Sequence, residues 1–168
     1  MKKSCWLLVF LFISSHSFGQ LLEYSEEIFK KEFIENLENL DQIEGVWNIS
    51  STQETYHFDT LFDVQQSKQP LKIAIIKQKD KFFSYQMSGE LFEAEFNSTD
   101  VKGVYLYRNY FPNISQYSKS QAVICKAGQM EYTYDFPKEY LLEKMNKQYS
   151  EGLRMVNILK WSKAFPSK

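Results

Sequence analysis

The sequence predicts a mainly β protein: a single eight-stranded antiparallel barrel with an N-terminal helix and a short helix before the last strand. Apolar and polar residues alternate with a period of two from Gly45 onward, which is typical of half-buried strands. The predicted strands follow one another with short turns between them, which favours an antiparallel meander. Eight such strands can close on themselves and leave no free edge.

Residues 1–19 are typical of a secretory signal peptide. A basic dipeptide precedes an uninterrupted apolar run at 6–13, and small residues lie just before Gln20. The apolar run is too short to cross a bilayer as a stop-transfer helix. The sequence therefore predicts an exported protein, periplasmic or secreted, with no membrane span. Residues 20–168 are predicted to form one β-barrel domain.

The composition narrows the possible partners and cofactors. Without the two lysines of residues 1–19, 18 basic residues stand against 21 acidic ones. Nucleic-acid binding requires a basic excess, so no nucleic-acid partner is expected. No glycine-rich phosphate loop is present, and no cofactor is expected. Cys125 is the single cysteine after residue 19, so an internal disulfide is impossible and the domain must hold together by packing.

The first predicted element is a helix at 25–40. Glu26 and Glu27 suit the positive end of a helix, and large apolar residues recur at helical spacing behind them. These residues are Phe29, Phe33, Leu37 and Leu40. The helix is therefore expected to bury one face and to expose an acidic one.

The predicted strands follow in order. They span residues 45–58, 71–77, 82–88, 91–97, 102–110, 121–126, 130–136 and 153–161. Residues 59–69 are polar and are expected to form a loop. A short helix is expected at 137–148, because Pro137 is well tolerated in a first helical turn.

The start of the first strand resembles a known family signature. Gly45-Val46-Trp47 is similar to the G-x-W motif of the lipocalins and the wider calycin barrels. Residues 40–47 are also similar to the L-D-x-I-E-G-x-W start of small exported lipocalin-like proteins of Bacteroidetes. The resemblance implies a barrel whose floor is closed by the preceding helix.

The same resemblance implies roles for individual residues at the floor. Gly45 would let the chain turn into the first strand, and Trp47 would pack across the base of the barrel. A basic residue of the last strand would cover the indole in a cation–π contact. Arg154 and Lys160 are the candidates for that residue.

A barrel of eight strands either fills its interior with its own side chains or holds one small ligand. Alternation along the predicted strands assigns a set of bulky side chains to the interior. The set is Phe83, Tyr85, Met87, Phe92, Phe96, Tyr132 and Tyr134. The leading hypothesis is non-catalytic binding of a small apolar molecule by these residues, with tyrosine hydroxyls orienting it.

A packed barrel that acts as an envelope protein-interaction module is the alternative. Its surface would be the acidic helix or a group of tyrosines expected to be exposed around Arg108, because tyrosine and arginine are enriched in binding hot spots. The tyrosines are Tyr105, Tyr107, Tyr110 and Tyr117. The partner would then be an envelope protein.

A hydrolase that uses His57 is the remote alternative. Cys125 is the one thiol that His57 could activate, but it follows an apolar run and is expected to be buried and inert. Glu93 and Glu95 share a strand face, and their spacing is that of an ordinary outward polar face. One histidine after residue 19 is too few for a zinc site, so neither a metal nor a catalytic residue is assigned.

Overall fold

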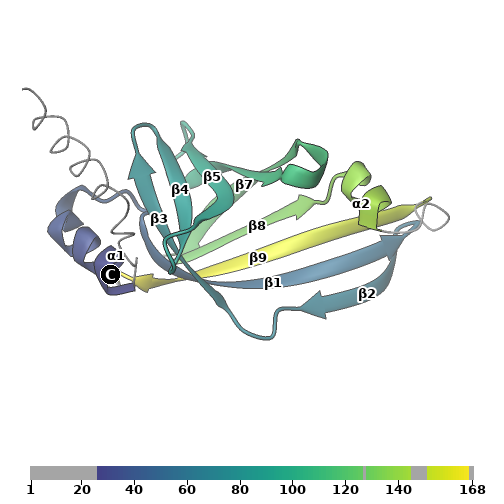
Figure 1. Ribbon diagram of the computed structural model, residues 1–168, viewed down its shortest axis with the longest axis horizontal. Helices are drawn as coiled ribbons and strands as arrows, with labels where there is room; N and C mark the ends of the chain where they lie inside the picture. Colours follow the sequence, from purple (N-terminus) through teal and green to yellow (C-terminus); the bar gives the residue numbers. More distant parts are fainter. Residues whose placement is uncertain (1–25, 127, 145–150, 167–168) are drawn as a thin grey trace, which may run out of the picture.

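The computed structural model describes residues 26–126, 128–144 and 151–166. The predicted signal peptide at 1–19 lies outside the described residues. One antiparallel sheet dominates the structure, with a helix against one end of it and a second helix near the other end (Figure 1).

The strands appear in the predicted order, with one addition. The strands are β1 (Gly45–His57), β2 (Thr60–Gln66), β3 (Leu71–Gln78), β4 (Lys81–Gln86), β5 (Leu91–Ser98), β6 (Val104–Phe111), β7 (Gln116–Lys126), β8 (Gln129–Asp135) and β9 (Leu153–Phe165). The helical elements are α1 (Glu26–Glu35), η1 (Leu37–Asn39), η2 (Pro112–Ile114) and α2 (Lys138–Lys144). None of the helices in these described ranges is long and apolar enough to cross a membrane.

The sheet closes because its first and last strands pair. β1 pairs with β9 along nearly its whole length, from Val46 opposite Phe165 to His57 opposite Leu153. β3 to β9 complete the ring through antiparallel neighbours. The predicted eight-stranded antiparallel barrel is therefore confirmed, and this architecture fits a lipocalin-like fold.

β2 is the additional strand, and the expectation of a loop at 59–69 is wrong. β3 pairs with β1 only from Gly45 to Ile49, and β2 takes over that side of β1 from Thr52 to His57. All seven β2 residues are exposed. A strand without a buried face shows no alternation of apolar and polar residues, so the sequence pattern did not reveal it. β2 forms because the backbone of β1 offers hydrogen bonds beyond the end of β3.

Two apolar clusters hold the fold together. The larger one fills the barrel and contains Trp47, Phe96 and Trp161. The smaller one places Phe29 and Phe33 of α1 against Val46 and Ala74, which are on the outward side of β1 and β3. The chain between α1 and β1 then carries Ile43 into the base of the barrel. The predicted helix therefore packs beside the floor, while Ile43 and Trp47 form the floor itself.

Candidate binding site

The floor of the barrel is built around Trp47. Its side chain is fully buried, and its Nε1 donates a hydrogen bond to the carbonyl oxygen of Ile43 at 2.8 Å. The ammonium of Lys163 lies 5.0 Å from the centre of the indole ring. The same ammonium donates to the carbonyl oxygens of Gln42 and Glu44 at 2.7 and 2.8 Å. Lys163 therefore ties the chain that enters β1 to the last strand.

Gly45 has a steric reason to be glycine. Its φ is +142°, and an added Cβ would lie 2.2 Å from the carbonyl oxygen of Phe165. Only a residue without a side chain allows the two backbones to approach this closely. The role that the sequence resemblance implied for Gly45 thus has a geometric basis.

The basic partner of Trp47 differs from expectation. Arg154 lies opposite Tyr56, with its guanidinium 5.7 Å from that ring, and it forms a two-bonded ion pair with Asp135 at 3.0 Å. Lys163 takes the place expected for Arg154 or Lys160, because β9 continues past the predicted end at residue 161. That extension sets Lys163 directly opposite Trp47 in the β1–β9 register.

Above the floor, aromatic rings fill the barrel. Trp161 contacts Trp47 and Phe96 with ring centres 6.3 and 5.8 Å apart. Tyr107 and Tyr132 follow, with ring centres 4.1 Å apart. Burial raises the pKa of both tyrosine hydroxyls well above the usual range. This section of the interior is therefore uncharged and occupied by the protein's own side chains.

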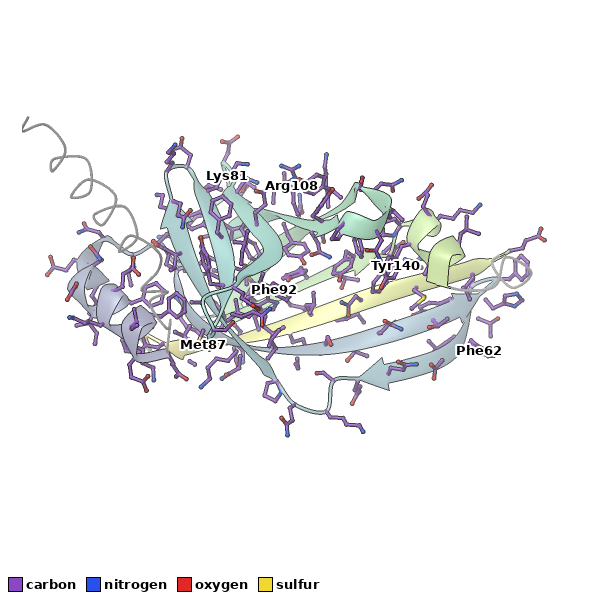
Figure 2. All side chains as sticks on the ribbon, viewed as in Figure 1. Phe62, Lys81, Met87, Phe92, Arg108 and Tyr140 are labelled. Atoms are coloured by element: carbon purple, nitrogen blue, oxygen red, sulfur yellow. The ribbon has the colours of Figure 1, made fainter. Side chains whose placement is uncertain are left out.

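Three of the seven predicted interior residues lie fully within the barrel. Phe96, Tyr132 and Tyr134 are buried in the main cluster. Phe92 is half buried and packs against the edge of the same cluster (Figure 2). Phe96 and Tyr132 belong to the filled section, whereas Tyr134 lies farther along β8, toward α2.

The expectation that Phe83, Tyr85 and Met87 face inward is wrong. Phe82 and Ser84 are the fully buried residues of β4, so the odd-numbered positions face the other way. Tyr85 and Met87 pack beneath α1 in the smaller cluster. Phe82 and Phe83 are adjacent near the start of the strand, and two adjacent aromatics make both registers of the alternation equally plausible from sequence.

Beyond the filled section the inner face continues toward α2. Tyr134 accepts a hydrogen bond from the Asn157 side-chain amide at 2.9 Å. Phe111, Phe136 and Tyr140 surround this pair, and the Phe136 and Tyr140 rings stack 5.3 Å apart. These five residues are called the mouth cluster below. Figure 2 shows Tyr140 between α2 and the sheet.

The mouth cluster borders inner-face residues that stay half buried. Asn157, itself a member of the cluster, shares the inner face of β9 with Leu159 and Trp161. Leu159 and Asn157 lie opposite Ser51 and Gln53 of β1. All four are half buried, in contrast to fully buried Trp161. The sequence prediction missed Asn157 and Leu159. Their spacing was the available signal, because residues 157, 159 and 161 alternate along one face of a strand.

The expected surface of exposed tyrosines is only partly present. Tyr105 and Tyr107 point into the core, and the Tyr105 hydroxyl donates to a carboxylate oxygen of Asp41. Burial also raises the pKa of Tyr105. Tyrosine is amphipathic and occupies either face of a strand. The prediction that Tyr105 and Tyr107 are exposed was therefore wrong.

The remaining tyrosines form a small stack on the outside. Tyr117 lies 4.8 Å from Tyr110, ring centre to ring centre, and the Arg108 guanidinium lies 4.3 Å from the Tyr117 ring. Arg108 also forms an ion pair with Glu95 at 2.7 Å. Figure 2 places Arg108 on the outer surface near Lys81, which is 3.4 Å from the other carboxylate oxygen of Glu95. The stack is an ordinary ion-paired strand surface.

The possible catalytic residues do not meet. His57 is exposed at the end of β1, opposite Leu153. Cys125 lies near the β7–β8 turn, level with Trp161. The prediction that this thiol is buried is wrong, because Cys125 is exposed. Eight residue steps along β9, from Leu153 to Trp161, separate His57 and Cys125 by about 26 Å. Within the described ranges, no three His, Cys, Asp or Glu side chains gather in a way that could hold a metal.

Two half-open hollows lie on the outside of the barrel. One of about 490 Å³ is lined by Asn48, Cys125 and Lys160, among others. The other, about 540 Å³, lies beside η1 and is lined by Leu37, Lys102 and Lys163, among others. Neither hollow is lined by any of the seven predicted ligand residues.

Comparisons of the chain with protein families, with curated proteins and with solved structures found no match.

Proposed function

We propose that the protein is a non-catalytic binding protein that holds a small apolar molecule between the mouth cluster and the half-buried inner face of β1 and β9. The observation that carries the proposal is the change in burial along one face of β9, from fully buried Trp161 to half-buried Leu159 and Asn157. Aromatic side chains with a few placed polar groups are the usual lining of a small-molecule site. Tyr134 and Asn157 supply the polar groups here.

The filled section below this face limits the ligand. Phe96, Tyr107, Tyr132 and Trp161 already occupy the barrel at the level of the floor. A ligand therefore lies across the mouth cluster rather than along the barrel axis. A small, flat, largely apolar molecule with one hydrogen-bond acceptor or donor suits stacked rings beside an amide–hydroxyl pair.

Titration with the apolar dye Nile red tests this site. We expect a saturable rise in dye fluorescence with one dye per chain. Leu159→Trp and Gln53→Trp place a bulky ring on the proposed site from two different strands, and each should weaken dye binding at least tenfold. Ile158→Trp puts the same ring on the outer face of β9 and should leave binding unchanged.

The exposed apolar strand β2 is a second place where the dye can bind, so every titration is repeated with Phe62→Ala. Dye binding that is lost in Phe62→Ala but retained in Leu159→Trp and Gln53→Trp would contradict the proposal. Far-ultraviolet circular dichroism of each variant shows whether the barrel is intact. Two fill-in variants on different strands keep the test decisive if one of them fails to fold.

We also propose that the protein is exported and belongs to the lipocalin-like barrels of the calycin group. The basic start and apolar run of residues 1–19 support export. The packing of Trp47 beneath a lysine of the last strand supports the relationship. Mass spectrometry of the protein recovered from its producing cells tests export, because cleavage of the signal peptide leaves Gln20 as the first residue.

A protein-interaction role is the second candidate, and one observation favours it. The barrel should have no free strand edge, yet β2 ends the sheet with exposed apolar side chains. The tyrosine surface considered from sequence does not carry this candidate, because Tyr107 is buried.

A further inference from the structure

β2 is an edge strand with unused backbone hydrogen-bonding groups. It heads the strand order of the sheet and, among the described residues, pairs with β1 alone. The backbone N–H of Ser67 donates to the carbonyl oxygen of Ser51 at 2.9 Å. Because antiparallel strands alternate the direction of these bonds, the N–H and C=O groups of Val64 and Gln66 point away from β1. They form a template for another strand.

The side chains of this hairpin are unusually apolar for a free edge. Phe58, Leu61, Phe62 and Val64 are exposed by 65, 50, 77 and 45 %. Figure 2 shows Phe62 at the end of the hairpin, outside the barrel. Natural edge strands are usually protected by lysine, proline or a covering element. Asp63 is the single charged residue of β2, although a bulge near Phe62 adds local twist.

β2 is complementary to itself in one antiparallel register. With Val64 at a two-fold axis, Asp63 lies opposite Gln65 of the second copy. The Gln65 amide already donates to the Asp63 carboxylate at 2.9 Å within one chain, so the same two groups can pair across the axis. A register centred on Asp63 would instead oppose two like charges, which is unfavourable.

We propose that β2 pairs with β2 of a second copy of this chain, so that two barrels join through one continuous sheet. The interface is isologous: each copy contributes the Val64 and Gln66 backbone groups, the apolar side chains and the Asp63–Gln65 pair. A closed two-fold interface uses both free edges and leaves none for further growth. The expected assembly is therefore a dimer and not a filament.

Sedimentation velocity of the purified protein over a range of concentrations tests the assembly. We expect a reversible monomer–dimer equilibrium. Val64→Pro removes an N–H that points away from β1, so it should abolish the dimer while the barrel stays folded. Leu106→Lys changes an apolar residue of similar exposure on β6, which is paired on both sides, and should leave the dimer unchanged.

Disulfide trapping tests the register, in a Cys125→Ser background. Residues opposite each other in an antiparallel pair have Cα atoms about 4.5–5.5 Å apart, within reach of a disulfide. Val64→Cys should therefore form a covalent dimer on mild oxidation. Gln65→Cys should not, because two copies of residue 65 would be diagonal neighbours about 7–8 Å apart.

Several outcomes would overturn the proposal. A monomer at all concentrations, a dimer that survives Val64→Pro, or open-ended oligomers would each do so. Cross-linking through Gln65→Cys but not Val64→Cys would refute the register. Dye binding at the mouth cluster does not depend on this interface, so a monomeric protein that still binds Nile red would leave the proposed function intact.

Discussion

Trp47 combines three interactions that fix the chain at the base of the barrel. Its indole is fully buried, donates to the Ile43 carbonyl and lies beneath the Lys163 ammonium. It also contacts Trp161 of the last strand. One side chain therefore joins the chain before β1, β1 itself and β9.

Truncation of this side chain should be costly. We expect Trp47→Ala to lower the free energy of unfolding by about 3–5 kcal/mol, the usual cost of deleting a buried large aromatic. Urea melts followed by circular dichroism measure it. Ile34→Ala is the control, because this side chain of α1 is 60 % exposed and lies away from β2, so it should contribute within about 0.5 kcal/mol. Equal midpoint shifts for the two variants would contradict the burial of Trp47.

Four buried tyrosines predict a sensitivity to alkaline pH. Burial raises the pKa of Tyr105, Tyr107, Tyr132 and Tyr134 in the folded protein. The folded state then keeps protons that the unfolded chain releases near pH 10, so stability is full below about pH 10 and falls as the pH rises above it.

Absorbance at 295 nm should show these four tyrosines ionising only together with loss of the circular dichroism signal. Tyr107→Phe removes one of the raised groups and should make the stability fall less steeply with pH. Ionisation of every tyrosine before unfolding would mean that the four hydroxyls are accessible to water.

At the level of elements, β7 and β8 are joined in two different ways. Near their turn they form a backbone ladder, in which Val123 lies opposite Glu131 and the register shifts between Ile124 and Lys126. Farther along, the ladder is replaced by side chains. The Ser118 hydroxyl donates to the carbonyl oxygen of Asp135 at 3.2 Å, and the Ser120 hydroxyl donates to that of Thr133. The barrel wall is therefore held by serines at this seam.

Removing these hydroxyls should weaken the seam. We expect Ser118→Ala to destabilise the protein by about 1 kcal/mol, because buried Ser118 satisfies a strand carbonyl that has no ladder partner there. Ser50→Ala is the matched control: Ser50 is exposed and lies on an intact ladder. Hydrogen exchange of β8 amides should accelerate in Ser118→Ala alone. An effect of Ser50→Ala as large as that of Ser118→Ala would argue against a special role for the seam.

The elements also show what the sequence could predict. Strands with one buried face, such as β8, alternate clearly, and most were located within a residue or two, although β7 begins five residues before its predicted start. β2 has no buried face, so nothing in its pattern distinguished it from a loop. In β4, the adjacent Phe82 and Phe83 fit either register, and the inward register predicted for Phe83 was wrong. Lys163 was missed because β9 runs four residues past its predicted end.

For the whole molecule, the decisive feature is the pairing of β1 with β9. Ile49 lies opposite Trp161, more than 100 residues away in sequence. The number of strands and their short connections were enough to predict this closure, because eight antiparallel strands hide their edges best as a ring. The binding face was less predictable, since it depends on which interior residues remain only half buried after packing.

Closure between distant strands should make folding slow. Proteins dominated by such non-local pairings fold in roughly milliseconds to seconds, whereas helical bundles fold in roughly microseconds to milliseconds. Stopped-flow tryptophan fluorescence measures this directly, because Trp47 and Trp161 come together only when β1 meets β9. Substitutions at the paired positions of β1 and β9 should slow the main folding phase, whereas Leu106→Lys on the outer face of β6 should not. A complete fluorescence change within the dead time would contradict the expectation.

The pairing of β1 with β9 has a consequence for the chain during synthesis. A ribosome makes β1 early and β9 more than 90 residues later, so a nascent chain carries β1 without the partner that completes the ring. Until β9 has emerged, the ring cannot close, and the inner residues of β1 lack their partners on that strand. We expect such a chain to expose apolar surface of the kind that chaperones bind.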